Sequence, residues 1–191
     1  MMSRRLYFSL PLLALSLVLA CGEGSAPTQS LEPTFSAGGT RQGFGFNGTA
    51  SGFPAGVVFL TGGGSFDPST ASNTIPAVTS VASGGGFRCI DAVAQGLLLG
   101  CGKGEGVRWD TAQLLSSTGF KCSLNDVGRT ATTGAGTVVL LADFYRAGDG
   151  DDESFTAPMI VSESDLAPDL PGLQHLWIQG VGCGSAVVHF N

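Results

Sequence analysis

Short apolar runs separated by glycines fill the chain from about residue 37 onward, and this pattern limits the fold more than any other feature. Val57 to Thr61 precedes a Gly-Gly-Gly stretch at 62–64, and Ala77 to Ala82 comes just before another at 84–86. Runs of this length, bounded by glycine, are typical of strands and are too short for stable isolated helices. The sequence therefore predicts a mainly β fold in which these glycines close the strands.

Other segments support the same fold class through their side-chain spacing. Phe44 and Phe46 stand two residues apart, which places them on one face of a strand. Thr137 to Tyr145 is almost continuously apolar, as expected for a strand buried on both faces. Phe155 to Val161 follows an acidic turn, so we expect a hairpin over residues 137–161. Two last strands are predicted at 173–179 and 185–190.

One segment favours a helix. Asp110 is suited to capping a first helical turn, and Gln113 stands three residues later, as in a capping box. Gly119 would end this helix, which we predict at residues 110–117. With seven or eight strands, one short helix and many glycine-rich turns, the prediction is an antiparallel β-sandwich or jelly-roll-like domain, with a small β-barrel as the alternative.

The N-terminus has the features of an export signal. Arg4 and Arg5 precede an apolar run from Leu6 to Ala20. A basic start and a short apolar segment are typical of secretory signals, and a membrane-spanning helix needs about 20 apolar residues. The sequence Val18-Leu19-Ala20-Cys21 resembles the lipobox of bacterial lipoproteins.

That resemblance implies lipidation of Cys21 and cleavage before it. Gly22 follows the cysteine in place of the Asp that favours inner-membrane retention, so the resemblance implies an outer-membrane or cell-surface lipoprotein. The alternative is an ordinary cleaved signal that leaves Cys21 free. We expect three parts: a signal peptide at 1–20, the lipidated cysteine with a flexible tether at 21–36, and a single β-rich domain at 37–191. The domain itself resembles no family that we can name.

Charge limits the partners of the mature chain. Because two of the nine basic residues belong to the signal, seven basic and fifteen acidic side chains remain, a net charge of −8. This balance disfavours nucleic acid, and the expected membrane contact is through the lipid anchor. The remaining candidate partners are a protein or a small ligand.

Four cysteines remain when Cys21 is assigned to lipid. An even number of cysteines in an exported domain predicts two disulfides, with three connectivities open. Proximity in sequence favours Cys89–Cys101 with Cys122–Cys183. Buried free thiols are the alternative.

The acidic turn holds the most function-like cluster of side chains. Asp149, Asp151, Asp152 and Glu153 stand close to two glycines and could supply oxygen ligands to Ca²⁺. The competing interpretation is a solvated hairpin tip whose charges deter aggregation. No other cofactor is predicted.

Three further side chains could take part in chemistry. If the last two strands form a hairpin around residue 182, His175 faces His189, and two facing imidazoles could bind a metal. Two unrelated histidines at the sheet rim are the competing interpretation. Asp143 stands in an apolar run, where a buried carboxylate needs a partner such as Arg146.

No segment shows a nucleophile, a base and an orienting group at a recognisable spacing. Residues 43–48 match Gly-x-Gly-x-x-Gly, but neither the preceding strand nor the following helix of a dinucleotide site is predicted there. The sequence therefore favours a non-catalytic binding or structural module of the cell envelope over an enzyme. The alternative is a secreted hydrolase with dispersed catalytic residues.

Overall fold

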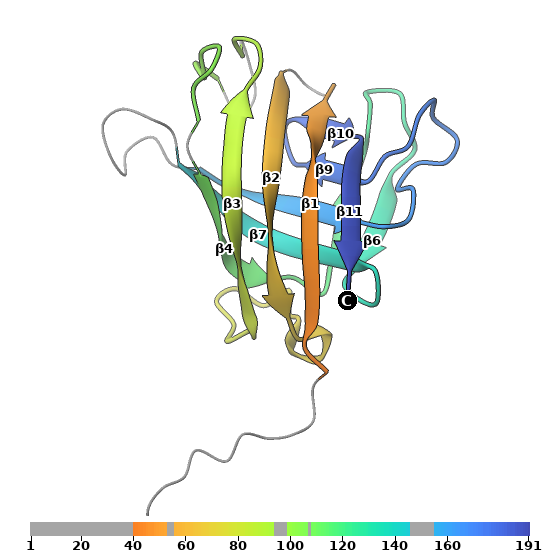
Figure 1. Ribbon diagram of the computed structural model, residues 1–191. Helices are drawn as coiled ribbons and strands as arrows, with labels where there is room; N and C mark the ends of the chain where they lie inside the picture. The colour runs from red at the N-terminus through yellow and green to blue at the C-terminus, as the bar shows by residue number, and fades with distance from the viewer. Residues whose placement is uncertain (1–39, 53–55, 94–98, 107, 146–154) are drawn as a thin grey trace, which may run out of the picture. The chain divides into compact units, whose positions relative to one another are not determined.

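The computed structural model describes residues 40–52, 56–93, 99–106, 108–145 and 155–191, and regular structure in this part of the chain is almost entirely β (Figure 1). The strands are β1 (Gln42–Ser51), β2 (Val57–Phe66), β3 (Val81–Cys89), β4 (Arg108–Leu114), β5 (Ser117–Phe120), β6 (Arg129–Thr132), β7 (Thr137–Tyr145), β8 (Phe155–Ser162), β9 (Leu176–Ile178), β10 (Gly182–Gly184) and β11 (Ala186–Phe190). Among the described residues, the only helical segment is a 3-10 turn at Pro68–Thr70.

Eight antiparallel strands close into a barrel, in the order β10-β9-β8-β7-β4-β3-β2-β1. The closing contact joins β1 to β10, where Ser51 lies opposite Cys183. β11 continues from β10 along the same edge of β1, with Gly48 opposite Ala186 and Phe44 opposite Phe190. The predicted mainly β class is therefore confirmed, and the alternative prediction of a small barrel fits better than the sandwich. Strong twist lets one sheet curl until its edges meet, which removes the need for a second sheet.

Aromatic side chains fill the barrel interior. Phe44 and Phe46 are both buried on one face of β1, as predicted, with parallel rings and centroids 6.4 Å apart. Trp109 on β4 is fully buried, and its ring centre lies 5.8 Å from that of Phe46. The indole Nε1–H of Trp109 donates to the Thr61 carbonyl at 3.2 Å. A barrel of eight strands is just wide enough for side chains to fill it, and these aromatic rings occupy that space.

The two triple-glycine stretches lie inside strands, so the prediction that they close strands is wrong. Gly62 on β2 lies opposite Phe46 on β1 and Gly85 on β3. A Cβ atom at Gly62 would stand 2.5 Å from the Cζ2 atom of Trp109, so the absence of a side chain makes room for the indole. Glycine runs therefore do not mark strand ends in this chain, because small residues inside one strand make room for bulky side chains from neighbouring strands of the barrel.

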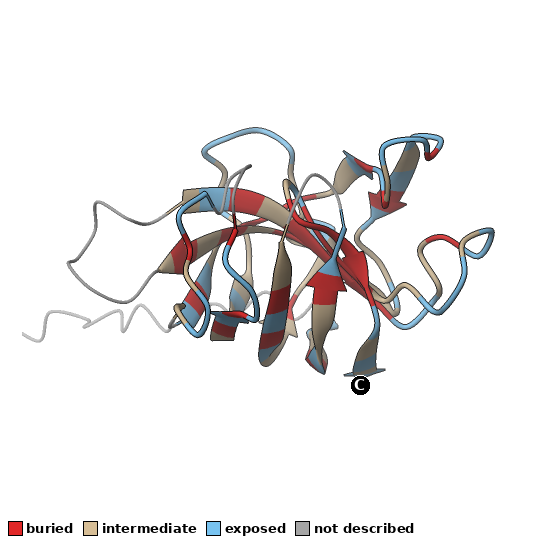
Figure 2. Cartoon of the chain, turned by 90° about the horizontal axis from the view of Figure 1, so that it is seen from above, coloured by how far each residue is buried: buried red, intermediate tan, exposed pale blue. Residues whose placement is uncertain are grey.

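β7 is buried on both faces over its first half, which confirms the prediction from its apolar run. Val138 and Leu140 point into the barrel, whereas Val139 lies on its outer face, and all three are fully buried. β8 pairs with it from Phe144 opposite Phe155 to Thr137 opposite Ser162, so the predicted hairpin is confirmed. Figure 2 shows buried positions recurring along the strands and exposed positions gathering in the connecting loops.

The predicted helix at 110–117 is wrong, because this segment forms β4 and the start of β5. Arg108 to Leu114 pairs with β7 across a bulge between Thr111 and Gln113. Gln113 caps no helix: its buried amide donates to the carbonyls of Ser72 and Thr74 at 2.8 and 2.9 Å. Local capping signals amount to about 1 kcal/mol, which burial of Trp109 in a sheet outweighs.

Both predicted disulfides are present. Cys89–Cys101 joins the end of β3 to the following loop, and Cys122–Cys183 joins the segment after β5 to β10. Disulfides persist in oxidising compartments, so they indicate an extracytoplasmic protein. Cys21, the signal and the tether lie outside the described residues.

Candidate functional site

A second layer covers one part of the outer barrel wall. This outer layer consists of the β5–β6 hairpin and its connecting loop, residues 117–132. It packs on a row of side chains that crosses four neighbouring strands, because Val139 lies opposite Ile160, Ile160 opposite Trp177, and Trp177 opposite Cys183. These side chains form a second buried cluster with residues of the outer layer, among them Phe120. The wall under the outer layer is therefore apolar on both faces.

An ion-pair cluster fixes the loop of the outer layer. The guanidinium of Arg129 on β6 binds the carboxylates of Asp126 and Asp169, and the Asp126 carboxylate also accepts the Cys122 backbone N–H at 3.0 Å. The hydrogen bond from Arg129 and then that from Cys122 lower the pKa of Asp126 below its usual value. The same bond to Asp126 raises the pKa of Arg129. This cluster therefore stabilises the ionised forms of Asp126 and Arg129, and its two carboxylates exceed its one guanidinium by one negative charge.

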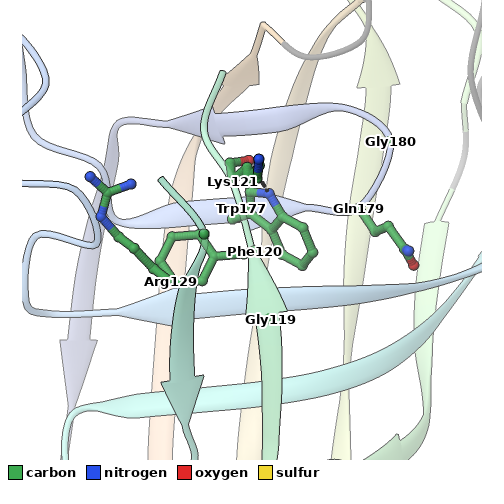
Figure 3. Close-up of a pocket in the computed structure, with 8 residues that line it drawn as sticks. Gly119, Phe120, Lys121, Arg129, Trp177, Gln179 and Gly180 are labelled. Atoms are coloured by element: carbon green, nitrogen blue, oxygen red, sulfur yellow. Dashed lines mark hydrogen bonds between the residues drawn. The ribbon is translucent and has the colours of Figure 1, made fainter. Parts of the chain in front are cut away.

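An apolar pocket of about 390 Å³ opens where the outer layer meets β9 and the turn that follows (Figure 3). We call it the outer pocket; it is lined by Gly119, Phe120, Lys121, Gly128, Arg129, Trp177, Gln179 and Gly180. Phe120 and Trp177 form its floor, with ring centres 5.8 Å apart. The Trp177 indole N–H is satisfied by the Lys121 carbonyl at 2.9 Å, so the indole presents its carbon framework to the pocket.

Polar groups of the outer pocket lie at its rim. Lys121 and Gln179 are exposed, and the Lys121 ammonium forms no ion pair with any described residue. Among the described residues that line the pocket, none carries a carboxylate, imidazole, thiol or hydroxyl group. The arrangement suits binding of an apolar body with a polar or anionic group at one end, and its side chains provide no nucleophile with a base beside it.

A more polar cavity of about 510 Å³ is lined by residues of the β5–β6 hairpin and of the segment around the end of β8. Hydroxyl groups and one carboxylate line much of it, including Thr130, Thr132, Ser164 and Asp165. The Asp165 carboxylate already accepts the backbone N–H groups of Ala167 and Gln174, both at 3.0 Å. These contacts give Asp165 a structural role in the loop after β8, so the outer pocket is the better candidate site.

The two histidines do not meet, so the conditional histidine pair does not form and the interpretation of two unrelated histidines fits. Gly180, with φ of +80°, allows a tight turn after Gln179, and β9 pairs with β10 instead of β11. The Nδ1–H of His175 donates to the Ser162 carbonyl at 3.0 Å. His189 lies on β11 opposite Gly45 of β1. A left-handed glycine at the turn shortened the hairpin and moved its register.

Asp143 has a simple partner on the outer face of β7. Its carboxylate accepts the Thr156 hydroxyl at 2.5 Å, and it lies opposite Asp110 of β4. The predicted calcium ligands Asp149, Asp151, Asp152 and Glu153 lie outside the described residues, as does Arg146. In the described ranges no group of three His, Cys, Asp or Glu side chains is placed to hold a metal ion.

Sequence reasoning did not find the outer pocket. Its floor is formed by Phe120 on β5 and Trp177 on β9, which are 57 residues apart in the sequence. One signal did exist, because the favoured Cys122–Cys183 pairing places the residues beside each cysteine close together. Lys121 and Trp177 are near those cysteines in sequence, but only the strand register shows that they share a pocket.

Comparison with known proteins adds no relative to this description: no family model, curated protein or solved structure matches the chain. In the part of the chain that the structure describes, no helix combines the length and apolar character needed to cross a membrane.

Proposed function

We propose that this protein is a lipid-anchored, non-catalytic binding module of the cell envelope, and that the outer pocket takes a small ligand with an apolar or aromatic body and an anionic group. The observation that carries the proposal is the aromatic floor of Phe120 and Trp177 with the Lys121 ammonium beside it. The signal segment, the Val18-Leu19-Ala20-Cys21 sequence and the two disulfides support export and anchoring.

Charge at the rim favours an anionic group on the ligand. The guanidinium of Arg129 is more than balanced by the carboxylates of Asp126 and Asp169, whereas the Lys121 ammonium forms no ion pair with a described residue. Among the residues that line the pocket, Lys121 is therefore the one whose cationic group is left for a ligand. A carboxylate, sulfonate or phosphate reaching Lys121 would leave the apolar body on the aromatic floor.

Rigidity supports binding without large rearrangement. The Cys122–Cys183 disulfide joins the outer layer to β10, and the Arg129 cluster holds its loop. Ordering a loop on binding costs affinity, and a site that is already ordered avoids this cost.

Fluorescence titration with anilinonaphthalene sulfonate tests the site, because this probe combines an aromatic body with an anion. Lys121→Gln should weaken binding about fivefold, as expected for loss of about 1 kcal/mol from an exposed ion pair. Lys103→Gln, which changes an exposed lysine in another loop, is the matched control. Uncharged phenylnaphthylamine should bind Lys121→Gln as tightly as the unmodified protein.

A second variant tests the apolar floor without removing it. Gly119 lies on β5, and a Cβ atom there would meet only the Arg129 carbonyl oxygen, at 3.8 Å. Gly119→Phe should fill the pocket and weaken both probes about tenfold or more while the fold remains intact. Equal probe affinity in Gly119→Phe and the unmodified protein would remove the outer pocket from the proposal. Cys21→Ser tests anchoring separately, since it should release the protein from the membrane.

A further inference from the structure

One end of the barrel displays apolar side chains to solvent. The loop between β2 and β3 carries Ile75 and Val78, which are 64% and 102% exposed, and Pro76 between them is also exposed. We call these three residues the apolar tip. Large aliphatic side chains this exposed and this close together are typical of a surface that contacts a partner or a membrane.

The apolar tip is held in place by buried and polar contacts from β4 and β5. The Gln113 amide donates to the Ser72 and Thr74 carbonyls and accepts the Ala77 N–H at 3.2 Å. The Asn73 side chain accepts the Ser116 N–H at 3.1 Å and donates to the Ser117 hydroxyl at 3.1 Å. These bonds fix the loop on both sides of the apolar tip, so the exposed side chains belong to an ordered surface.

The chain enters the barrel at this same end. Gln42, the first residue of β1, lies opposite Phe66, the last residue of β2, and the loop with the apolar tip begins directly after it (Figure 1). Nineteen peptide steps separate Cys21 from Thr40, and a chain of that length spans at most about 65 Å. A lipid on Cys21 would therefore bring this end of the barrel to the membrane more often than the other end.

The loop that carries the apolar tip is uncharged, although the exposed carboxylate of Glu163 lies at the same end of the barrel, where it accepts the Phe190 N–H at 2.8 Å. Residues 68–80 carry no charged side chain, and neither do residues 111–120, which include the segment bonded to the loop. Asp67 is engaged, because its carboxylate accepts the Ser69 N–H at 3.0 Å. Exposed Arg41, just before β1, suits the phosphates of lipid headgroups. An uncharged loop that presents apolar side chains is complementary to the headgroup boundary of a bilayer.

We infer that the apolar tip inserts into the headgroup boundary of the membrane and orients the barrel on it. This inference rests on the proposed lipid anchor, which converts a weak contact of two aliphatic side chains into an intramolecular one. β5 runs from Ser117, which is bonded to Asn73 beside the apolar tip, to Phe120 in the outer pocket. The anchored orientation thus leaves the Lys121 rim accessible from the aqueous side.

Quenching by brominated lipids tests this orientation on the lipidated full chain. The chain is reconstituted in vesicles of phosphatidylethanolamine and phosphatidylglycerol with brominated acyl chains. Val78→Trp should be quenched about twofold relative to unbrominated vesicles, because its indole reaches the acyl boundary. Leu99→Trp is the matched control: Leu99 is 61% exposed in the loop after β3, at the opposite end of the barrel. Trp109 and Trp177 contribute equally to both variants.

The outcomes separate the anchor from the orientation. Flotation with the vesicles and quenching confined to Val78→Trp would support the inference. Flotation with equal quenching of both variants would overturn the orientation and leave the anchor intact, whereas failure to float would overturn the anchor and the orientation with it. Self-association in detergent that is lost in Ile75→Asp/Val78→Asp, without quenching of Val78→Trp, would assign the apolar tip to a second copy and overturn the inference.

Discussion

Replacing Gly62 with alanine tests whether the glycines inside β2 are required by the aromatic filling of the barrel. A Cβ atom there would lie 2.5 Å from Cζ2 of Trp109 and 2.6 Å from the Gly84 carbonyl oxygen, both well inside ordinary contact distance. Ala normally gains about 0.5–1 kcal/mol over Gly in a strand interior. At Gly62, overpacking should cost more than this gain, and we expect a net destabilisation of about 1–3 kcal/mol.

Urea denaturation followed by circular dichroism measures this change, and Gly119→Ala is the matched control. Gly119 also lies in a strand, but its Cβ atom would meet nothing closer than 3.8 Å. Gly119→Ala should therefore leave stability unchanged or raise it. Combining Gly62→Ala with Trp109→Phe should reduce the penalty, because the smaller ring leaves more room, and a double-mutant cycle gives this coupling energy. A Gly62→Ala protein at least as stable as Gly119→Ala would refute the packing argument.

Three more predictions concern stability. Val139→Asp should destabilise the folded protein by about 3–5 kcal/mol or abolish folding, because Val139 is fully buried beneath the outer layer. Val187→Asp, at an exposed position of β11, is the control and should unfold at nearly the same urea concentration as the unmodified protein. The chain-entropy relation gives about 4 kcal/mol for loss of Cys122–Cys183, which spans 61 residues, and about 3 kcal/mol for loss of Cys89–Cys101, which spans 12. The unfolding midpoints of the two double Cys→Ser variants should follow that order. Alkylation of these four cysteines in the unreduced exported protein would contradict both bonds. Because the pKa of Asp126 is lowered on folding, the ionised carboxylate stabilises the folded protein above about pH 4, and this stabilisation is lost as the pH falls through the folded pKa. Asp126→Asn should therefore be less stable than the unmodified protein at pH 7 and should lose less stability than it does between pH 5 and 3. Parallel acid-unfolding curves of the two proteins would argue against this role of Asp126.

Of the candidate site, the sequence predicted the disulfide beside it, but not the residues that line it. The even cysteine count led to the correct bond between Cys122 and Cys183, which is the framework of the outer pocket. The floor residues Phe120 and Trp177 belong to different strands and have no local pattern in common. The acidic cluster at 149–153 was conspicuous because its members are adjacent, and adjacency is the feature that single-sequence reasoning detects most readily.

The sequence by itself determined the elements whose side chains alternate or stay apolar over a long enough run. β7 begins and ends at Thr137 and Tyr145 as predicted, and Phe44 and Phe46 share a buried face, because burial depends there on the strand's own period of two. Tertiary structure decided the rest. The segment from Asp110 to Leu114 forms a strand because pairing of β4 in the sheet places the Trp109 indole in the space beside Gly62. The fold is a barrel because the sheet closes where Ser51 lies opposite Cys183. This closure depends on the summed twist of eight strands and on contacts between residues more than a hundred positions apart, which no local sequence pattern encodes.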